Sequence, residues 1–535
     1  MSQLAKNKRS LTSIDMFAGC GGLSLGLKGA KFNLLMANEM SSMAAESFAY
    51  NLLDDNLKEL GEKDEHPKKT VWLNSSFEDV SSRLRENPLT SPKQGEGYSD
   101  LYDKKVDLTG KLVIADIVQL NEFIKKDNFY LEAFDNNFFG QKVDLISGGP
   151  PCQSFSMAGL REQNCDKNTL PFEFCEFVKM VKPKLVLLEN VTGILRAFTQ
   201  GSEKYYAWFE VAKTFASIGY LPICLHLNAR QAGVPQNRPR FILIGIRSDT
   251  YESLKPALNN AERELLIPSE FLIKRMLSNL SIKVDEFTYF DYQKSGHLKL
   301  LRKTFLSELF GNEEVSVESA IGDIWSRSKD PSTYVSSLNK RYSFLEQHKS
   351  ERNEDEKNED ERTHSEPVKK RFRLYQILSG IDKATAVQVQ KVLSGKAQQI
   401  SADAWKVLSK FEYYLGEEKY GKFTSLDNFI NHLMELKTKK HSQRALLPGK
   451  PAPAALSIPD DVCHYDKSQL RTLTVREMAR IQSFPDSFRF RSKITTGGTM
   501  RQYEVPQYTQ VGNAVPPDLG HKLGLSLKKL LAKES

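Results

Sequence analysis

One cysteine of this sequence follows a turn that specifies its backbone. Residues 145–155 run from an apolar stretch through two glycines and two prolines to Cys152. Cysteine is most often a small buried hydrophobe, but a thiol held directly after such a turn fills a core poorly. We therefore interpret Cys152 as a nucleophile that forms a covalent intermediate.

A carboxylate and two arginines could act beside such a nucleophile. Glu189 follows the apolar run 185–188, and a carboxylate at the end of a buried strand is unfavourable unless it is paired or functional, which suits a general acid. Arg238 and Arg240 alternate along an extended segment, so they point the same way and could contact phosphate or carbonyl oxygens. An ordinary exposed basic loop would explain these two arginines equally well.

Three glycines near the N-terminus indicate a nucleoside-binding turn. Gly19, Gly21 and Gly22 stand where backbone without side chains can approach a ligand at a helix N-terminus. Glu39, twenty residues after Gly19, stands where a carboxylate would accept hydrogen bonds from ribose hydroxyls. Ser24 takes the place of the third glycine of a dinucleotide fingerprint, so the kind of nucleoside stays open. An NAD-dependent dehydrogenase would have no use for the Pro-Pro-Cys turn.

Short apolar runs alternate with amphipathic stretches from residue 13 to 250. This rhythm is typical of a doubly wound α/β sheet whose strands are buried on both faces. The predicted strands are 13–17, 32–37, 143–147, 185–188 and 241–246. Residues 54–110 are rich in charged residues, serine and proline, so we predict a charged surface insertion that contributes little to the core.

The pattern loosens from about residue 251 to 450. Residues 349–373 hold 16 charged residues among 25, eight of each sign, which predicts a solvated, disordered loop. Order returns at 473–482, where Thr474 and Glu477 fit a capping box at the start of a helix.

The composition is that of a folded globular protein with more than one domain. Its 535 residues are 40% hydrophobic and 27% charged, and a formal net charge of +8 mildly favours polyanionic partners. The six cysteines form no C-x-x-C pair, so we predict neither a disulfide scaffold nor a metal. No run of eighteen apolar residues and no signal peptide can be recognised, so we expect a cytoplasmic protein without a membrane partner.

In order and spacing the segments above resemble the cytosine-C5 DNA methyltransferases that use S-adenosylmethionine. Phe-Ala-Gly-Cys-Gly-Gly at 17–22 resembles the family's first motif, and Gly-Gly-Pro-Pro-Cys-Gln-Ser-Phe-Ser at 148–156 resembles its nucleophile motif. Glu-Asn-Val at 189–191 resembles its acid motif, and Gln-Asn-Arg-Pro-Arg at 236–240 resembles its eighth.

The C-terminal part of the chain extends the resemblance. Residues 471–485 and 510–517 match the family's last two motifs, and 316–323 resembles a segment that flanks its variable region. The resemblance implies a Rossmann-like S-adenosylmethionine-dependent methyltransferase sheet in residues 1–250 with 505–535. It implies a second, variable target-recognition domain in residues 251–504.

The resemblance also assigns roles to the candidate residues. Cys152 would add to C6 of a flipped-out cytosine, Glu189 would contact N3, and Arg240 would hold the O2 carbonyl. Arg238 is grouped with these catalytic residues, although a backbone or structural contact suits it better. The implied S-adenosylmethionine contacts are Phe17, Gly19, Gly21, Gly22, Leu23, Glu39, Asp116, Ile117 and Asn513. The interval from Glu39 to Asp116 is longer than in compact family members, which makes Asp116 and Ile117 the least direct assignments.

The implied reaction is methyl transfer from S-adenosylmethionine to C5 of cytosine within a specific double-stranded DNA sequence. The implied setting is a restriction-modification system with a cognate endonuclease, and a monomer associated with the nucleoid through DNA. A transfer-RNA cytosine methyltransferase would share the motifs, but we would expect a smaller middle region. A catalytically silent DNA-binding module would be expected to lose Cys152 or Glu189, and both are present.

Overall fold

The computed structural model describes most of the chain. The described ranges are 10–92, 95–102, 104–135, 137–151, 169–200, 203–326, 330–346, 358–438, 443–454 and 462–534. Cys152 lies outside the described residues, so its predicted role stays a prediction. Among the described residues, no helix is both long and apolar enough to cross a membrane.

Nine strands form one sheet in the described part of the chain. The strand order is β11-β9-β10-β6-β5-β1-β2-β4-β3, and β10 is antiparallel to both of its neighbours whereas the other pairs are parallel. The strands are β1 (Leu11–Met16), β2 (Phe32–Glu39), β3 (Thr70–Trp72), β4 (Lys111–Ile114), β5 (Leu145–Gly148), β6 (Leu185–Val191), β9 (Tyr220–Asn228), β10 (Pro239–Arg247) and β11 (Phe290–Asp291). The predicted α/β class and the five predicted strands are confirmed.

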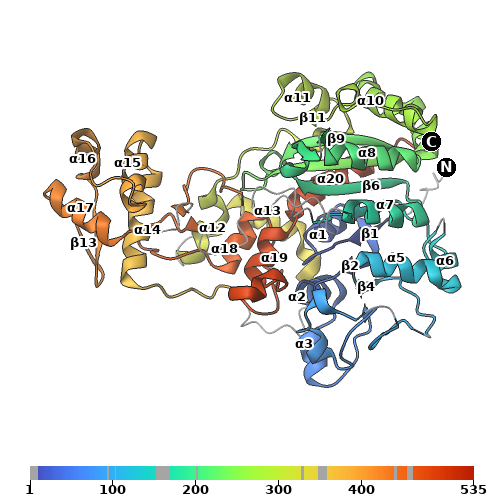
Figure 1. Ribbon diagram of the computed structural model, residues 1–535, viewed down its shortest axis with the longest axis horizontal. Coiled ribbons are helices and arrows are strands. Elements are labelled where there is room, and N and C mark those ends of the chain that lie inside the picture. The colour runs from blue at the N-terminus through green and yellow to red at the C-terminus, as the bar shows by residue number, and fades with distance from the viewer. Residues whose placement is uncertain are drawn as a thin grey trace, which may run out of the picture.

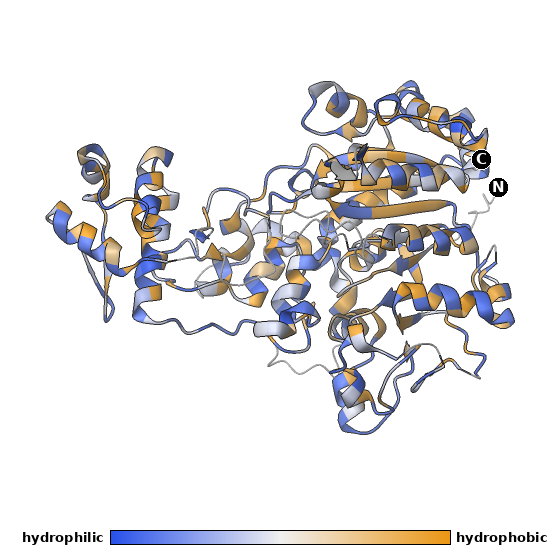
Figure 2. Cartoon of the chain, viewed as in Figure 1, coloured by the Kyte–Doolittle hydropathy of each residue, from blue (hydrophilic) through white to orange (hydrophobic). Residues whose placement is uncertain are grey.

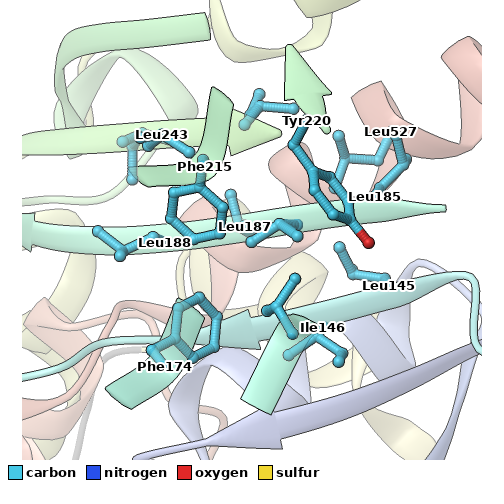
Figure 3. Packing of buried hydrophobic residues seen from close by; sticks show 14 of the residues in the cluster. Leu145, Ile146, Phe174, Leu185, Leu187, Leu188, Phe215, Tyr220, Leu243 and Leu527 are labelled. Carbon is cyan, nitrogen blue, oxygen red and sulfur yellow. The ribbon is translucent and has the colours of Figure 1, made fainter. Parts of the chain in front are cut away.

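Helices cover the sheet in two groups, which Figure 1 shows on its opposite faces. One group is α5 (Ile117–Lys126), α7 (Leu170–Val181), α8 (Ala207–Ser217) and α10 (Asn260–Leu277), and the other is α1 (Gly22–Gly29) and α20 (Pro517–Leu531). The central strands are buried along nearly their whole length, and their side chains form much of the core. Figure 3 shows Phe174, Phe215 and Leu527, from three helices, gathered around residues of β5 and β6.

Helices α1 and α20 approach each other closely through glycines. A Cβ atom on Gly26 would lie 2.3 Å from the Pro517 carbonyl oxygen, and one on Gly524 would lie 2.6 Å from the Ala30 Cβ. A side chain at either position would therefore force the helices apart. This contact joins the first helix after β1 to the C-terminal helix of the chain.

We predicted that the first part of the sheet domain ends at residue 250, but the packing of this domain continues well beyond that residue. Helix α10 packs against α8 and β9, and β11 extends the sheet beside β9. Leu265, Leu301 and Phe305 belong to the same core as the central strands. The correction has a simple cause: short segments with mixed polarity, such as the two-residue β11, carry too weak a periodicity to be assigned to the sheet from sequence.

The insertion 54–110 contributes more to the core than we predicted. It contains α3 (Leu57–Glu62), α4 (Val80–Arg83) and β3, which pairs with β4 as the edge strand of the sheet. Trp72, Leu73 and Leu108 are at most 1% exposed. These and other buried apolar residues of the segment, such as Leu57 and Leu101, are scattered among charged residues, so composition alone hides them.

Most of the remaining described residues form a layer beside the sheet domain and a distal lobe. The layer holds α12 (Val317–Trp325), α13 (Thr333–Arg341), α18 (Val475–Ile481) and α19 (Gln507–Asn513), and its apolar core includes Leu25 of α1. Helix α18 begins with the predicted capping box, so that prediction is confirmed. The distal lobe, residues 366–436, lies at the left of Figure 1.

The distal lobe has an apolar core of its own. It comprises α14 (Glu366–Ser379), α15 (Lys383–Leu393), α16 (Ala402–Leu408), α17 (Leu426–Glu435) and the antiparallel pair β12 (Tyr413–Gly416) and β13 (Lys419–Gly421). Figure 2 shows hydrophilic residues over much of the outside of its helices. The prediction of a disordered loop over 349–373 is wrong for residues 366–373, because they form the start of α14, whose charged side chains there are exposed or half-buried while Phe372 is buried.

Candidate active site

A cavity of about 840 Å³ lies at the carboxyl edge of the central strands, a size typical of ligand sites. It is lined by residues at or just beyond the carboxyl ends of β1, β2, β4, β5 and β6, and by residues 512–515 before α20. Most of the predicted site residues line it: Phe17, Gly19, Gly22, Leu23, Glu39, Asp116, Ile117, Glu189, Arg238, Arg240 and Asn513. The structure thus brings together residues that are separated by nearly the whole chain.

The turn after β1 adopts a backbone that favours glycine. Phe17, Gly19 and Gly21 have φ angles of 55°, 57° and 97°, all in the left-handed region. Gly21 does not line the cavity: a Cβ atom there would lie 2.7 Å from a Leu52 side-chain carbon and 2.9 Å from one of Phe48. Gly21 therefore serves the packing of the turn, whereas its neighbours face the cavity.

Glu39 is fixed by backbone groups on both oxygens. Its Oε2 accepts a hydrogen bond from the Gly19 amide at 2.8 Å, and its Oε1 accepts one from the Ser41 amide at 2.8 Å. Burial raises the pKa of Glu39 above its ordinary value, while these two bonds act in the opposite direction. A carboxylate oxygen has lone pairs beyond one bond, so Glu39 can also accept bonds from a ligand's hydroxyls.

Asp116 lies close to Glu39 in the fold despite the long interval between them. Strand β4 pairs directly with β2 and places Ile114 beside Glu39. Asp116 then caps α5, accepting a hydrogen bond from the Val118 amide at 2.8 Å. The assignment of Asp116 and Ile117 to the same cavity therefore does not depend on the length of the chain that connects the two strands.

Asp15 is a polar residue of the site that our sequence reasoning did not single out. It is 1% exposed, at the end of β1, and accepts hydrogen bonds from the hydroxyls of Ser24 and Ser147. Burial raises its pKa to about 6, against the effect of these bonds. The signal available in the sequence is an acidic residue inside an otherwise apolar strand.

Glu189 and Arg240 form an ion pair at the other end of the cavity. They come from the neighbouring strands β6 and β10, and the Arg240 Nε lies 2.6 Å from Glu189 Oε1. The Nε–H is not aimed at the carboxylate in hydrogen-bond geometry, so the contact is an ion pair rather than a directed bond. Both side chains are largely buried, at 11% and 12% exposure. Gly149 leaves room beside them, because a Cβ atom there would lie 3.3 Å from Glu189 Oε2.

Asn190 positions the turn that leads to Cys152. It is 3% exposed, and its Nδ2 donates a hydrogen bond to the Pro150 carbonyl at 3.1 Å. Pro150 and Pro151 line the cavity next to Glu189, and the described chain stops at Pro151 before it resumes at Thr169.

Arg238 has a structural role, as its bonds show. It is 2% exposed, and its Nη2 donates hydrogen bonds to the carbonyls of Gly512 and Ala514, both at 2.9 Å. Burial lowers its pKa well below the ordinary value. These bonds fix the backbone on both sides of Asn513, whose exposed side chain lines the cavity. These bonds favour the structural contact that we preferred for Arg238, and its grouping with the catalytic residues stays a prediction.

Two further features of the site bear on its chemistry. Cys20 is 2% exposed, and burial raises the pKa of its thiol to about 12, which disfavours the thiolate that a nucleophile needs. Within the described ranges, no three His, Cys, Asp or Glu side chains are grouped so that they could hold a metal ion.

Comparison with known proteins gives a consistent family. A family model described as C-5 cytosine-specific DNA methylase matches residues 11–74 and 99–529. Type II methyltransferase M.DdeI of Desulfomicrobium norvegicum is 26% identical over 511 residues, covering 95% of this chain and 86% of that protein. Type II methyltransferase M.AgeI of Thalassovita gelatinovora is 23% identical over 523 residues, covering 97% and 99%.

A third relative matches over a shorter range. Type II methyltransferase M1.HphI of Haemophilus parahaemolyticus is 29% identical over 256 residues, covering 47% of this chain and 50% of that protein. The family model, by contrast, includes every strand of the sheet and every described residue that lines the cavity except Pro88 and Leu89. The chain therefore belongs to the C-5 cytosine-specific DNA methylases and is a DNA (cytosine-5)-methyltransferase.

Proposed function

We propose that this enzyme transfers a methyl group from S-adenosylmethionine to C5 of cytosine within a specific double-stranded DNA sequence, through a covalent Cys152 adduct on a flipped-out base. The observation that carries the proposal is the division of the cavity. The Glu189–Arg240 ion pair lies at one end of the cavity, beside β6. Glu39 and Asp116 lie toward the other end, and strands β5 and β1 separate them from the ion pair.

The residues at the Glu39 and Asp116 end of the cavity fit a nucleoside methyl donor. Glu39 and Asp116 offer carboxylate oxygens to hydroxyl or amino groups, Phe17 and Ile117 offer apolar surface to a base, and the turn at Gly19 brings backbone close. S-adenosylmethionine, when bound, supplies an activated methyl group. The protein's part is to orient this donor toward the end of the cavity that holds Glu189.

The residues at the Glu189 and Arg240 end of the cavity fit a cytosine ring. C5 of cytosine is too weak a nucleophile to take up a methyl group directly, but addition of the Cys152 thiolate to C6 turns C5 into an enamine carbon. Glu189 would donate a proton or hydrogen bond at N3 as electrons move into the ring, and Arg240 would stabilise the charge that develops at O2. After methylation, loss of the C5 proton returns electrons to the ring and expels the Cys152 thiolate.

The base has to leave the DNA stack to reach this cavity. Unstacking costs a few kcal/mol, which contacts in the cavity and to phosphates offset. We propose that the distal lobe and parts of the preceding 251–365 region recognise the DNA sequence. The distal lobe supports this because it is an autonomous apolar core attached beside the sheet domain rather than part of it.

The names of the relatives suggest a biological setting. M.DdeI, M.AgeI and M1.HphI are each named as type II methyltransferases. We propose that this enzyme likewise protects DNA from a cognate restriction endonuclease, and that it acts as a monomer.

The test is to incubate the purified protein with S-adenosylmethionine and unmethylated genomic DNA, with a transfer-RNA pool in parallel, and to sequence both for 5-methylcytosine. A Cys152→Ala variant serves as the blank. We expect methylcytosine confined to one short DNA motif and none with the variant. Methylation only in RNA would refute the DNA substrate, and full methylation by the variant would refute the covalent step.

A further inference from the structure

The insertion 54–110 reaches the cavity at one point. The short 3-10 helix Pro88–Thr90 places Pro88 and Leu89 among the residues that line the cavity. Leu89 is also one of the exposed large hydrophobic side chains, at 53% exposure. A single exposed leucine needs no explanation by itself, but one that faces a ligand cavity offers apolar surface to the ligand.

The sheet order tells which end of the cavity Leu89 faces. The lining residues follow strands in the order β6, β5, β1, β2 and β4, from Glu189 at one end to Asp116, Ile117 and Val118 at the other. The segment of Leu89 is connected to this second end through Asn74. The Asn74 side chain donates a hydrogen bond to the side chain of Gln119 on α5, and the Asn74 backbone carbonyl accepts one from the Ser91 hydroxyl at 3.5 Å.

Further bonds hold the segment in one conformation. Asn87 caps it and accepts a hydrogen bond from the Leu89 amide at 3.0 Å. The Glu86 carboxylate accepts bonds from the Ser75 hydroxyl at 2.6 Å and the Ser76 amide at 2.7 Å, directly after β3. The position of Leu89 is therefore set by the edge strand of the sheet and by α5, although the residue lies in an insertion.

We propose that Leu89 forms an apolar wall over the purine of the methyl donor and contributes to its binding. The inference rests on the proposed function, which places the reactive methyl group toward Glu189 and so leaves the purine for the end of the cavity beside Ile117. Leu89 and Ile117 then contact the same base, one from the insertion and one from α5. The insertion that interrupts the sheet between β2 and β4 thereby supplies part of the donor site.

The test measures binding of the product S-adenosylhomocysteine by calorimetry in the full-length protein. Leu89→Ala should weaken binding about tenfold: it removes three carbons, about half of whose surface would be in contact because the residue is 53% exposed, and each methylene withdrawn from an apolar contact changes affinity by a factor of roughly four. Leu89→Met should restore most of the affinity, since its side chain can fill the same space. Leu277→Ala is the matched control, because Leu277 is 61% exposed on α10 and does not line the cavity.

Steady-state kinetics give a second measurement. In Leu89→Ala, KM for S-adenosylmethionine should rise by the same factor, while kcat and KM for DNA stay unchanged, and the thermal midpoint should match the wild type because the side chain is half exposed. Wild-type affinity in Leu89→Ala, or a rise in KM for DNA alone, would overturn the inference. A wild-type protein that binds no S-adenosylhomocysteine would instead refute the proposed function, so the two failures can be told apart.

Discussion

Substitution of Gly26 by alanine tests the contact on which the geometry of the cavity depends. Gly26 lies in the middle of α1, and a Cβ atom there would meet three backbone atoms of the segment that starts α20: Pro517 O at 2.3 Å, His521 N at 2.6 Å and Gly520 C at 2.8 Å. Because all three belong to helix backbone rather than to flexible side chains, the contact can be relieved only by moving one helix away from the other by about 1 Å.

The expected cost follows from two opposing effects. Overpacking a well-packed contact costs about 3 kcal/mol when backbone has to move. Alanine also favours a helix interior over glycine by about 1 kcal/mol, which offsets part of that cost. We expect a net loss of about 2 kcal/mol in the free energy of unfolding. Gly22, where α1 begins, and residues 512–515, which precede α20, line the cavity. Because a shift of either helix would move these residues, binding of S-adenosylhomocysteine should weaken as well.

Thermal scanning of the purified variants measures the first effect, and calorimetry with S-adenosylhomocysteine measures the second. Gly296→Ala is the matched control, because Gly296 lies in α11 (Ser295–Leu301) and a Cβ atom there would meet nothing within 4 Å. The control should match or slightly exceed the wild-type midpoint. If Gly26→Ala also melted at the wild-type temperature and bound the product normally, the argument for a rigid helix contact would be refuted.

Three other predictions follow from the site. Glu189→Gln should lower kcat by roughly 10²- to 10⁴-fold in a methylation assay and leave S-adenosylhomocysteine binding intact; wild-type turnover would contradict its acid role. Arg238→Ala should lower the thermal midpoint and donor affinity together, because it leaves the carbonyls of Gly512 and Ala514 buried without donors at about 1–3 kcal/mol each; a loss of kcat alone would contradict this. For Asp15, the raised pKa of about 6 means that the folded protein holds its proton more tightly than the unfolded chain, so the free energy of unfolding should fall as pH rises from about 4 to about 6. Urea titrations across this range should show a smaller fall in Asp15→Asn, and equal slopes would refute the assignment.

The strands that the sequence predicted are those with apolar residues on both faces. The run at 185–188 became the centre of β6 and the run at 241–246 the centre of β10, because a strand buried on both sides needs continuous apolar sequence. Strand β9 was not predicted: Pro222, His226 and Asn228 interrupt its pattern. Its pairing with β10 and β11 shows that the strand accommodates these positions.

The chemical residues were predictable to a different degree. Glu189 was singled out because it follows the apolar run of a strand, and Arg240 because it alternates with Arg238 just before one. Their ion pair follows from the register of β6 and β10. Arg238 could not be separated from Arg240 by alternation alone, because that pattern gives the side on which a residue lies and not its partner. Its partners, at 512 and 514, are more than 270 residues away in the chain.

The insertion illustrates why chain length is a poor guide to site geometry. Glu39 and Asp116 are adjacent because β2 and β4 share hydrogen bonds, and the residues between them leave and re-enter the sheet at its edge. An insertion at this edge can become longer without moving either carboxylate, because β3 joins β4 on the side away from β2. It can also turn back over the carboxyl ends of the strands, as the segment of Leu89 does. An insertion at the edge of such a sheet can thus vary in sequence and still reach the cavity, whereas a segment inserted between two central strands would separate the residues of the site.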